Sequence, residues 1–180
     1  TYMIEKPSMV VKNGDGWGGS DSTNISYYAP AFYRRFGEAT SNSGWNQVVD
    51  RSYQTMNNSL SQGYGNANNG LVPSWCTSAG VSIWPHASLT PRPWYQYDSC
   101  RTPFRTVLDY VWFGDSRALT YCTKTSNFFS GVGAVSIVDG YQLTGAPSPE
   151  MPSLAVSQNP GFQSAAFCGP AGVCGMVSDS

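Results

Sequence analysis

Charged side chains are scarce in this chain, at 12% of 180 residues, and 10 basic against 11 acidic residues leave a formal net charge of −1. Binding to phosphate backbones or to anionic lipid needs a basic surface. We therefore expect no nucleic-acid partner and no membrane partner. Apolar runs are short as well, because none approaches the ~20 residues that span a bilayer.

Histidine is rarer still, since His86 is the only one, and no two of the five cysteines form a CxxC pair. A structural zinc site is therefore not expected. A Ser/His/Asp site would have to recruit His86 from a proline-flanked loop, with no nucleophile elbow around any serine. The glycine-rich stretch NGDGWGG lacks the lysine of a phosphate loop and predicts a turn that presents Trp17. We expect neither a metal nor a cofactor.

The cysteines, among so few charges and with 19 glycines and 12 prolines, favour a secreted, oxidising setting with disulfides. The odd number leaves one thiol over. Cys168 and Cys174 could pair across a turn, but on one helix they would lie too far apart to bridge. The start of the chain lacks the regions of a signal peptide, so we expect a chain that has been processed or cut.

Hydrophobic periodicity predicts a mainly α-helical protein with its functional residues in loops. The clearest helix is WNQVVDRSYQTMNNSL, and SYYAPAFYRRFGEAT before it predicts a helix entered near Pro30. Residues 63–95 are too rich in glycine and proline for either period. Two helices joined by a tight turn follow, and a small-residue helix from Pro160 closes the chain. The first of that pair, TPFRTVLDYVWFG, is expected to bury a stripe of Phe104, Val107, Leu108, Val111 and Trp112.

One aspartate stands apart from the other acidic residues. Asp115 fits a helix cap, and Asp109 fits the helix face opposite the apolar stripe. Asp98, within YQYDSCRTPF, instead lies between the long loop and the next helix. There, a carboxylate can be directed into a cleft and kept ionised by Arg101. The alternative is a purely structural role, as a helix cap or as the partner of Arg101.

Aromatic residues provide a second signal, because the chain has 6 tryptophans and 11 tyrosines, many of them in predicted loops. Flat aromatic rings stack on the apolar C–H faces of sugars, as a sugar-binding cleft requires. The alternative for any one of these rings is that it seals the core. The loop tryptophans that we expect to line such a cleft are Trp17, Trp75, Trp84 and Trp94.

Several of these stretches together resemble glycoside hydrolase family 8, which includes endoglucanases and xylanases. They are SYYAPAFYRRFGEAT, WNQVVDRSYQTM, GLVPSW, YQYDSCRTPFRTVLDYVWFG, VDGYQLTG and NPGF, in the family's order. The resemblance implies an (α/α)6 barrel with inner and outer helices and a sugar groove built by loops at one end. It also implies an enzyme that cuts β-1,4 glycosidic bonds with inversion, with a polysaccharide or oligosaccharide as its partner.

The resemblance assigns roles to particular residues. Asp98 matches the family's general base, which activates water opposite a proton-donating acid. By the same match, Tyr97 and Arg101 are expected in the groove, one orienting sugar or water and the other holding the carboxylate. Tyr28 and Tyr33 are further candidates for hydrogen bonds near the attacked carbon.

The chain also departs from the family pattern, because the family's acid glutamate lies in an earlier Ser-Glu-Gly type segment with no counterpart here. We therefore expect residues 1–180 to be one region of a catalytic domain whose barrel is incomplete, with the remainder outside this chain or on another chain. The rival hypothesis is a non-catalytic glycan-binding or structural protein that keeps a degenerate barrel. The sequence does not distinguish cellulose or β-glucan from xylan as the substrate.

Overall fold

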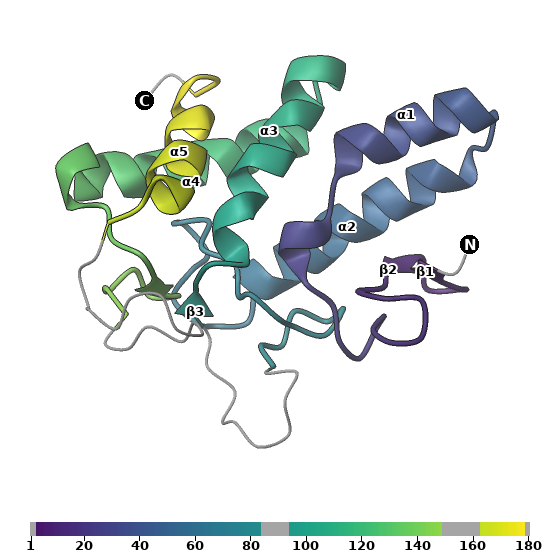
Figure 1. Cartoon of the computed structure of the whole chain (residues 1–180), viewed down its shortest axis with the longest axis horizontal. Helices are drawn as coiled ribbons and strands as arrows, with labels where there is room; N and C mark the ends of the chain where they lie inside the picture. The colour runs from purple at the N-terminus through teal and green to yellow at the C-terminus, as the bar shows by residue number, and fades with distance from the viewer. Residues whose placement is uncertain (1–2, 84–93, 149–162, 179–180) are drawn as a thin grey trace.

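The computed structural model describes residues 3–83, 94–148 and 163–178, and helices dominate it (Figure 1). The central helix, α3, packs against α1, α4 and α5, while α2 packs against α1. Figure 1 shows α1 and α2 on one side of α3, with α4 and α5 on the other. The helices are α1 (Pro30–Thr40), α2 (Gly44–Leu60), α3 (Thr102–Phe113), α4 (Ser116–Val132) and α5 (Ala165–Gly175).

Two short antiparallel strand pairs hold the connecting segments in place. In the first pair Ile4 lies opposite Val11, and in the second Tyr95 lies opposite Tyr141. The strands are β1 (Ile4–Glu5), β2 (Val10–Val11), β3 (Trp94–Tyr95) and β4 (Tyr141–Gln142). Single 3-10 turns complete the described elements: η1 (Ile25–Tyr27), η2 (Ser99–Arg101) and η3 (Ala134–Ser136).

Local sequence signals account for the helix boundaries. Pro30 opens α1, as predicted, because its fixed φ suits a first helical position. Gly114 ends α3 in a left-handed conformation with φ 68°, and Asp115 then caps α4 by accepting a hydrogen bond from the Arg117 backbone N–H at 2.9 Å. The closing helix is confirmed at α5, whereas Pro160 lies outside the described residues.

The predicted orientation of α3 is wrong. Of the expected apolar stripe, Val107 is buried, but Phe104, Val111 and Trp112 are exposed. Asp109, expected on the outer face, is fully buried instead. The reason is that Arg34 and Tyr53 satisfy its carboxylate inside the protein, which offsets the cost of burying a charge. Much of the apolar side of α3 is consequently exposed in the part of the chain that the structure describes.

The cysteines also differ from expectation. All five are free thiols, four of them buried, so the predicted disulfides are not found. Cys168 and Cys174 share α5, where their spacing prevents pairing. Cys174 instead contacts Cys122 of α4, and this hydrogen bond, together with burial, raises the pKa of the Cys174 thiol. The oxidising setting stays a prediction. Among the described helices, none is both long and apolar enough to cross a membrane.

Candidate active site

The turn η2 carries Asp98 at its N-cap position, directly before α3. A second loop is fastened beside it, because the hydroxyls of Ser74 and Ser99 are hydrogen-bonded at 2.9 Å and both are buried. This contact fixes the segment that carries Trp75 against the turn that carries Asp98. A carboxylate and a large aromatic ring from distant parts of the sequence therefore meet at the N-terminal end of α3.

Two donors hold the Asp98 carboxylate. Its Oδ1 accepts a hydrogen bond from Arg101 Nη2, and its Oδ2 accepts one from the Trp75 indole Nε1 at 3.1 Å. The side chain nevertheless remains 31% exposed. Because a carboxylate offers about four acceptor sites, two donors leave room for a water molecule. Asp98 is thus ion-paired and oriented, but it is not sealed in the interior.

Aromatic rings form a wall beside this carboxylate. Trp17 stacks on Trp75 with ring centroids 5.7 Å apart, and Tyr27 meets Trp75 edge-on at 6.4 Å. The Arg101 guanidinium lies over the Tyr27 ring at 5.7 Å and also donates to the Ser26 hydroxyl at 3.3 Å. Trp17 is exposed, whereas Trp75 is buried beneath it. The wall therefore presents Trp17 and part of Tyr27 to solvent next to an anionic oxygen.

Two of the predicted tyrosines do not reach this site. Tyr28 is buried, and its hydroxyl is hydrogen-bonded to Thr23 at 2.9 Å. Tyr33 is buried too, where it donates to the Tyr27 backbone carbonyl at 3.1 Å, and burial raises its pKa to about 12. Both phenols serve the core, so the expectation that they hydrogen-bond near a sugar is corrected.

Tyr27 occupies the place predicted for Tyr28, and the sequence reasoning missed it. The signal that could have found it is spacing: Ile25 and Tyr28 are three residues apart around a 3-10 turn and share its buried side. Tyr27, one position away, then points to the partly exposed side.

The Tyr97 side chain contacts Asp139 and Phe167 of α5. Its hydroxyl donates to Asp139 Oδ2 at 2.7 Å, and its ring packs edge-on against Phe167 at 5.3 Å. Ser164 donates to the other Asp139 oxygen at 2.8 Å. The hydrogen bond to Asp139 raises the Tyr97 pKa, because ionising the phenol would place two negative charges together. Tyr97 is thus neighbour to Asp98 in sequence, but its hydroxyl is engaged by Asp139.

Of the two remaining predicted tryptophans, only Trp94 lies among the described residues. Trp94 is partly buried on β3, where its carbonyl accepts a hydrogen bond from the Ser74 backbone N–H at 3.2 Å. This bond ties β3 to the segment that carries Trp75. Trp84 and the sole histidine, His86, lie outside the described residues.

Among the described residues, no second carboxylate is hydrogen-bonded to Arg101 or Trp75, the two residues that hold Asp98. Glu5 is engaged by the Ser8 and Ser20 hydroxyls in the N-terminal hairpin, and the Ser20 bond is the main reason why its pKa is lowered. Glu38 pairs on the surface with Arg35 at 2.7 Å. Within the same described residues, no group of three or more metal-ligating side chains occurs. Both glutamates of the described residues are thus held by groups other than those around Asp98.

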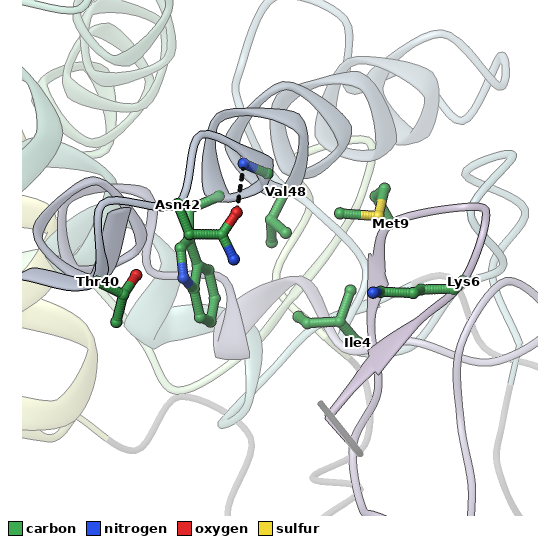
Figure 2. Close-up of a pocket in the computed structure, with 8 residues that line it drawn as sticks. Ile4, Lys6, Met9, Thr40, Asn42 and Val48 are labelled. Carbon is green, nitrogen blue, oxygen red and sulfur yellow. Dashed lines mark hydrogen bonds between the residues drawn. The ribbon is translucent and has the colours of Figure 1, made fainter. Parts of the chain in front are cut away.

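A separate hollow lies between the β1–β2 hairpin and the turn that joins α1 to α2 (Figure 2). Its lining is mostly apolar, and Lys6 is its one charged residue. Asn42 braces the turn by accepting a hydrogen bond from the Gly44 backbone N–H at 2.9 Å. Because no carboxylate lines this hollow, it cannot carry acid–base chemistry of the kind that Asp98 offers.

Comparison with known proteins places this geometry in a family. The model of the glycosyl hydrolases family 8 matches residues 1–166. Endoglucanase 2 of Ruminiclostridium josui is 44% identical over 144 residues, which are 80% of this chain and 29% of the relative. Endoglucanase A of Acetivibrio thermocellus is 39% identical over 176 residues, which are 98% of this chain and 33% of the relative. The chain thus spans about a third of these relatives.

The same comparison extends to solved structures. The apo structure of a beta-1,3-1,4-glucanase from Paenibacillus sp. X4 superposes with a TM-score of 0.78 at 28% identity. The superposition covers 99% of this chain and 46% of the glucanase chain. Structures of this family are (α/α)6 barrels, so the helices described above are part of such a barrel, as predicted. On the family match and the relatives together, the chain belongs to glycosyl hydrolases family 8.

Proposed function

We propose that this chain supplies the general base of a secreted, inverting enzyme that hydrolyses β-1,4 glycosidic bonds, and that Asp98 is this base. One observation carries the proposal: the Asp98 carboxylate is held between Arg101 and Trp75, yet it keeps exposed acceptor capacity beside an aromatic wall. A base that takes a proton from water needs such accessible acceptor capacity.

The chemistry follows from this arrangement. Asp98 accepts a proton from a water molecule, and the water oxygen attacks the anomeric carbon on the face opposite the leaving oxygen. Arg101 stabilises the ionised carboxylate and orients it. Trp17 offers an exposed ring on which a sugar can stack. Because water forms its bond to the anomeric carbon on the face opposite the bond that breaks, this single displacement inverts the configuration.

Inversion also requires an acid that protonates the leaving oxygen, at ~6.5–9.5 Å from the base. No other carboxylate in the described ranges is hydrogen-bonded to Arg101 or Trp75, and we infer that a segment outside these ranges supplies this acid. A β-glucan is the favoured substrate, because the relatives are named endoglucanases and the solved neighbour at 28% identity is named a beta-1,3-1,4-glucanase. Xylan is the alternative. A polymer too large to enter a cell fits the proposed secreted location.

A chimaera tests the role of Asp98. In it, this chain replaces the matching region of Endoglucanase A, so that the remainder of the barrel is present. We expect the chimaera to release sugar from β-glucan, and Asp98→Asn to lower kcat by at least about a hundredfold, the range that a general base contributes. The matched control is Asp50→Asn, which removes a carboxylate from an exposed pair with Arg117. Turnover by Asp98→Asn at the control's rate would refute the role.

A glycan-binding protein without catalysis is the second candidate, because the exposed ring of Trp17 can stack on a sugar whether or not Asp98 acts as a base. It predicts that the chimaera binds cello-oligosaccharides through Trp17 but does not cut them. Tryptophan fluorescence during an oligosaccharide titration, combined with reducing-sugar release, separates the two candidates. Binding that is lost in Trp17→Ala, with no release by the unsubstituted chimaera, would favour the second.

A further inference from the structure

The hollow of Figure 2 is built from two separate segments of the chain. The β1–β2 hairpin contributes Ile4, Lys6 and Met9, while Asn42 and Trp45 come from the α1–α2 turn and the first turn of α2. The hollow has a volume of about 250 Å³. Ligand pockets range upward from about 300 Å³, so this one is small and suits a molecule with a single ring rather than an oligosaccharide.

The apolar wall of the hollow is already packed from behind. Ile4 and Val48, which both line it, are buried members of the main hydrophobic core. Trp45 is held by two aromatic neighbours, because it stacks on Tyr33 with ring centroids 5.9 Å apart and meets Phe36 edge-on at 5.2 Å. A wall that is fixed in this way loses little conformational entropy when a ligand binds to it.

The polar side chains of the hollow mainly offer hydrogen-bond donors. Asn42 Oδ1 accepts a hydrogen bond from the Gly44 backbone N–H at 2.9 Å, and this bond orients the amide so that its NH₂ group remains to donate. The Thr40 hydroxyl donates its proton to the Phe36 carbonyl at 2.5 Å. Among the described residues, none forms a hydrogen bond or ion pair with the Lys6 ammonium. Figure 2 shows Lys6 and Asn42 on opposite sides of the hollow, so a cation and an amide donor face the same space.

We propose that this hollow binds a small organic monocarboxylate with a flat apolar body, its carboxylate at Lys6 and Asn42 and its body against Trp45. Charge complementarity selects the anion, because an ionised carboxylate only accepts hydrogen bonds and the Lys6 ammonium only donates them. The apolar wall selects for an organic body, which gains from leaving water. A neutral sugar gains less, because it has no charge to pair with Lys6. The lining of the hollow shares no residue with the surroundings of Asp98, so this inference is independent of the proposed function.

An NMR titration of the ¹⁵N-labelled 180-residue chain tests the site with matched probes. 3-Phenylpropionate carries a carboxylate and a flat ring, and 3-phenylpropanamide replaces the carboxylate by a neutral amide of similar shape. We expect 3-phenylpropionate to shift the signals of the Gly44 amide and the Trp45 indole and to saturate below about 10 mM, and the amide to bind at least about tenfold more weakly. No saturation, shifts confined to other signals, or equal affinities of the two probes would overturn the proposal.

Substitutions of Lys6 separate a specific site from general attraction between charges. Lys6 is exposed, so replacing it should leave the fold intact. Lys6→Met keeps a long apolar side chain and should weaken 3-phenylpropionate binding at least about tenfold. Lys12→Met is the matched control, since Lys12 follows the same hairpin but does not line the hollow, and it should leave the affinity unchanged.

A charge reversal gives a gain of binding that a merely damaged site would not show. Lys6→Glu should bind 3-phenylpropylamine, a cation with the same flat ring, at least about tenfold more tightly than the unsubstituted chain does. Equal losses of 3-phenylpropionate affinity in Lys6→Met and Lys12→Met would overturn the proposal. So would cellobiose that shifts the Gly44 and Trp45 signals with an affinity equal to that of 3-phenylpropionate, because the occupant would then be a sugar.

Discussion

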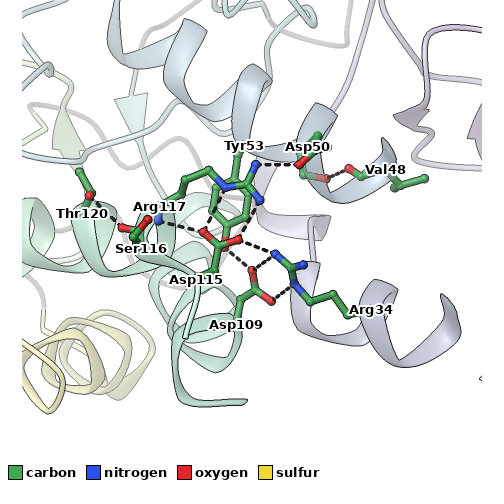
Figure 3. Close-up of polar contacts among 10 residues, drawn as sticks. Arg34, Val48, Asp50, Tyr53, Asp109, Asp115, Ser116, Arg117 and Thr120 are labelled. Carbon is green, nitrogen blue, oxygen red and sulfur yellow. Dashed lines mark hydrogen bonds and ion pairs between the residues drawn. The ribbon is translucent and has the colours of Figure 1, made fainter. Parts of the chain in front are cut away.

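Two aspartates near α3 have similar partners and different surroundings. Asp98, before the helix, accepts hydrogen bonds from Arg101 and from the indole of Trp75. Asp109, within the helix, accepts two from Arg34, at 2.8 and 3.3 Å, and one from the hydroxyl of Tyr53 at 2.7 Å (Figure 3). The Asp98 side chain is partly exposed, whereas that of Asp109 is completely buried. Partner chemistry alone therefore does not decide whether a carboxylate is open to solvent or closed off from it.

The two aspartates differ in how much of the carboxylate remains accessible to solvent once its hydrogen-bond donors are in place. Three donors and complete burial leave no route for solvent to Asp109. Around it, Arg34 and Arg117 both contact Asp115, and Arg117 also reaches Asp50 at 2.8 Å, so the network joins α1, α2, α3 and α4 (Figure 3). Burial, and then the hydrogen bond to Asp109, raise the Tyr53 pKa and keep this phenol neutral. Such a network holds helices together and offers no place for a substrate.

The largest effect is expected from breaking the buried site. Asp109→Ala would leave the Arg34 guanidinium and the Tyr53 hydroxyl without their carboxylate, and we expect it to destabilise the fold by about 3–5 kcal/mol. Urea unfolding followed by circular dichroism measures this. Asp50→Ala, which removes the exposed end of the same network, should cost less than about 1 kcal/mol. Equal costs would mean that burial does not distinguish the two carboxylates.

Low pH should weaken the ion-pair network that Asp115 forms with Arg34 and Arg117. Burial disfavours ionised Asp115, but hydrogen bonds and charge from Arg117, with the charge of Arg34, outweigh burial and lower its pKa below the ordinary value of 3.8. A lowered pKa in the folded state stabilises the protein above the ordinary pKa, and this stability is lost as pH falls through the folded value. Urea midpoints between pH 6 and pH 2 should therefore drop below about pH 4. Asp115→Asn should flatten that drop, and an unchanged curve would contradict the assignment.

The smallest effect on stability is expected at Asp98. Its pair with Arg101 is partly exposed on both sides, so Asp98→Asn should change the free energy of unfolding by less than about 1 kcal/mol. Urea unfolding of the chain and of the chimaera checks this beside the turnover assay. A loss of stability as large as that of Asp109→Ala would show that Asp98 is a structural residue as well, and the contrast between the two aspartates would fail.

Local features of the fold could be predicted from the sequence where neighbouring residues decide them. The helix predicted at 45–60 is observed as Gly44–Leu60, and Pro30, Gly114 and Asp115 set helix ends as expected. The face of α3 could not be predicted, because periodicity finds an apolar stripe without saying which side has a partner. The rule that apolar residues lie inside assumes a complete set of neighbours, and α3 lacks one among the described helices.

In the candidate site, too, contacts between sequence neighbours could be predicted, whereas contacts between distant loops could not. Asp98 and Arg101 lie three residues apart, so their pairing could be anticipated, and the motif around them pointed to the family. That the Trp75 indole binds this carboxylate, and that Trp17 stacks on Trp75, depends on loops far apart in the sequence. The choice of Tyr27 over Tyr28 for the site was decided by which side of η1 packs on the core.

By itself, the sequence determined the family, the helices and the one aspartate worth testing, because motifs, caps and short-range pairs are properties of neighbouring residues. Only the tertiary structure decided that Asp98 stays open while Asp109 is closed, and that the apolar side of α3 faces outward. Burial is a property of the whole packing arrangement: a carboxylate or an apolar stripe takes its role from the segments that surround it.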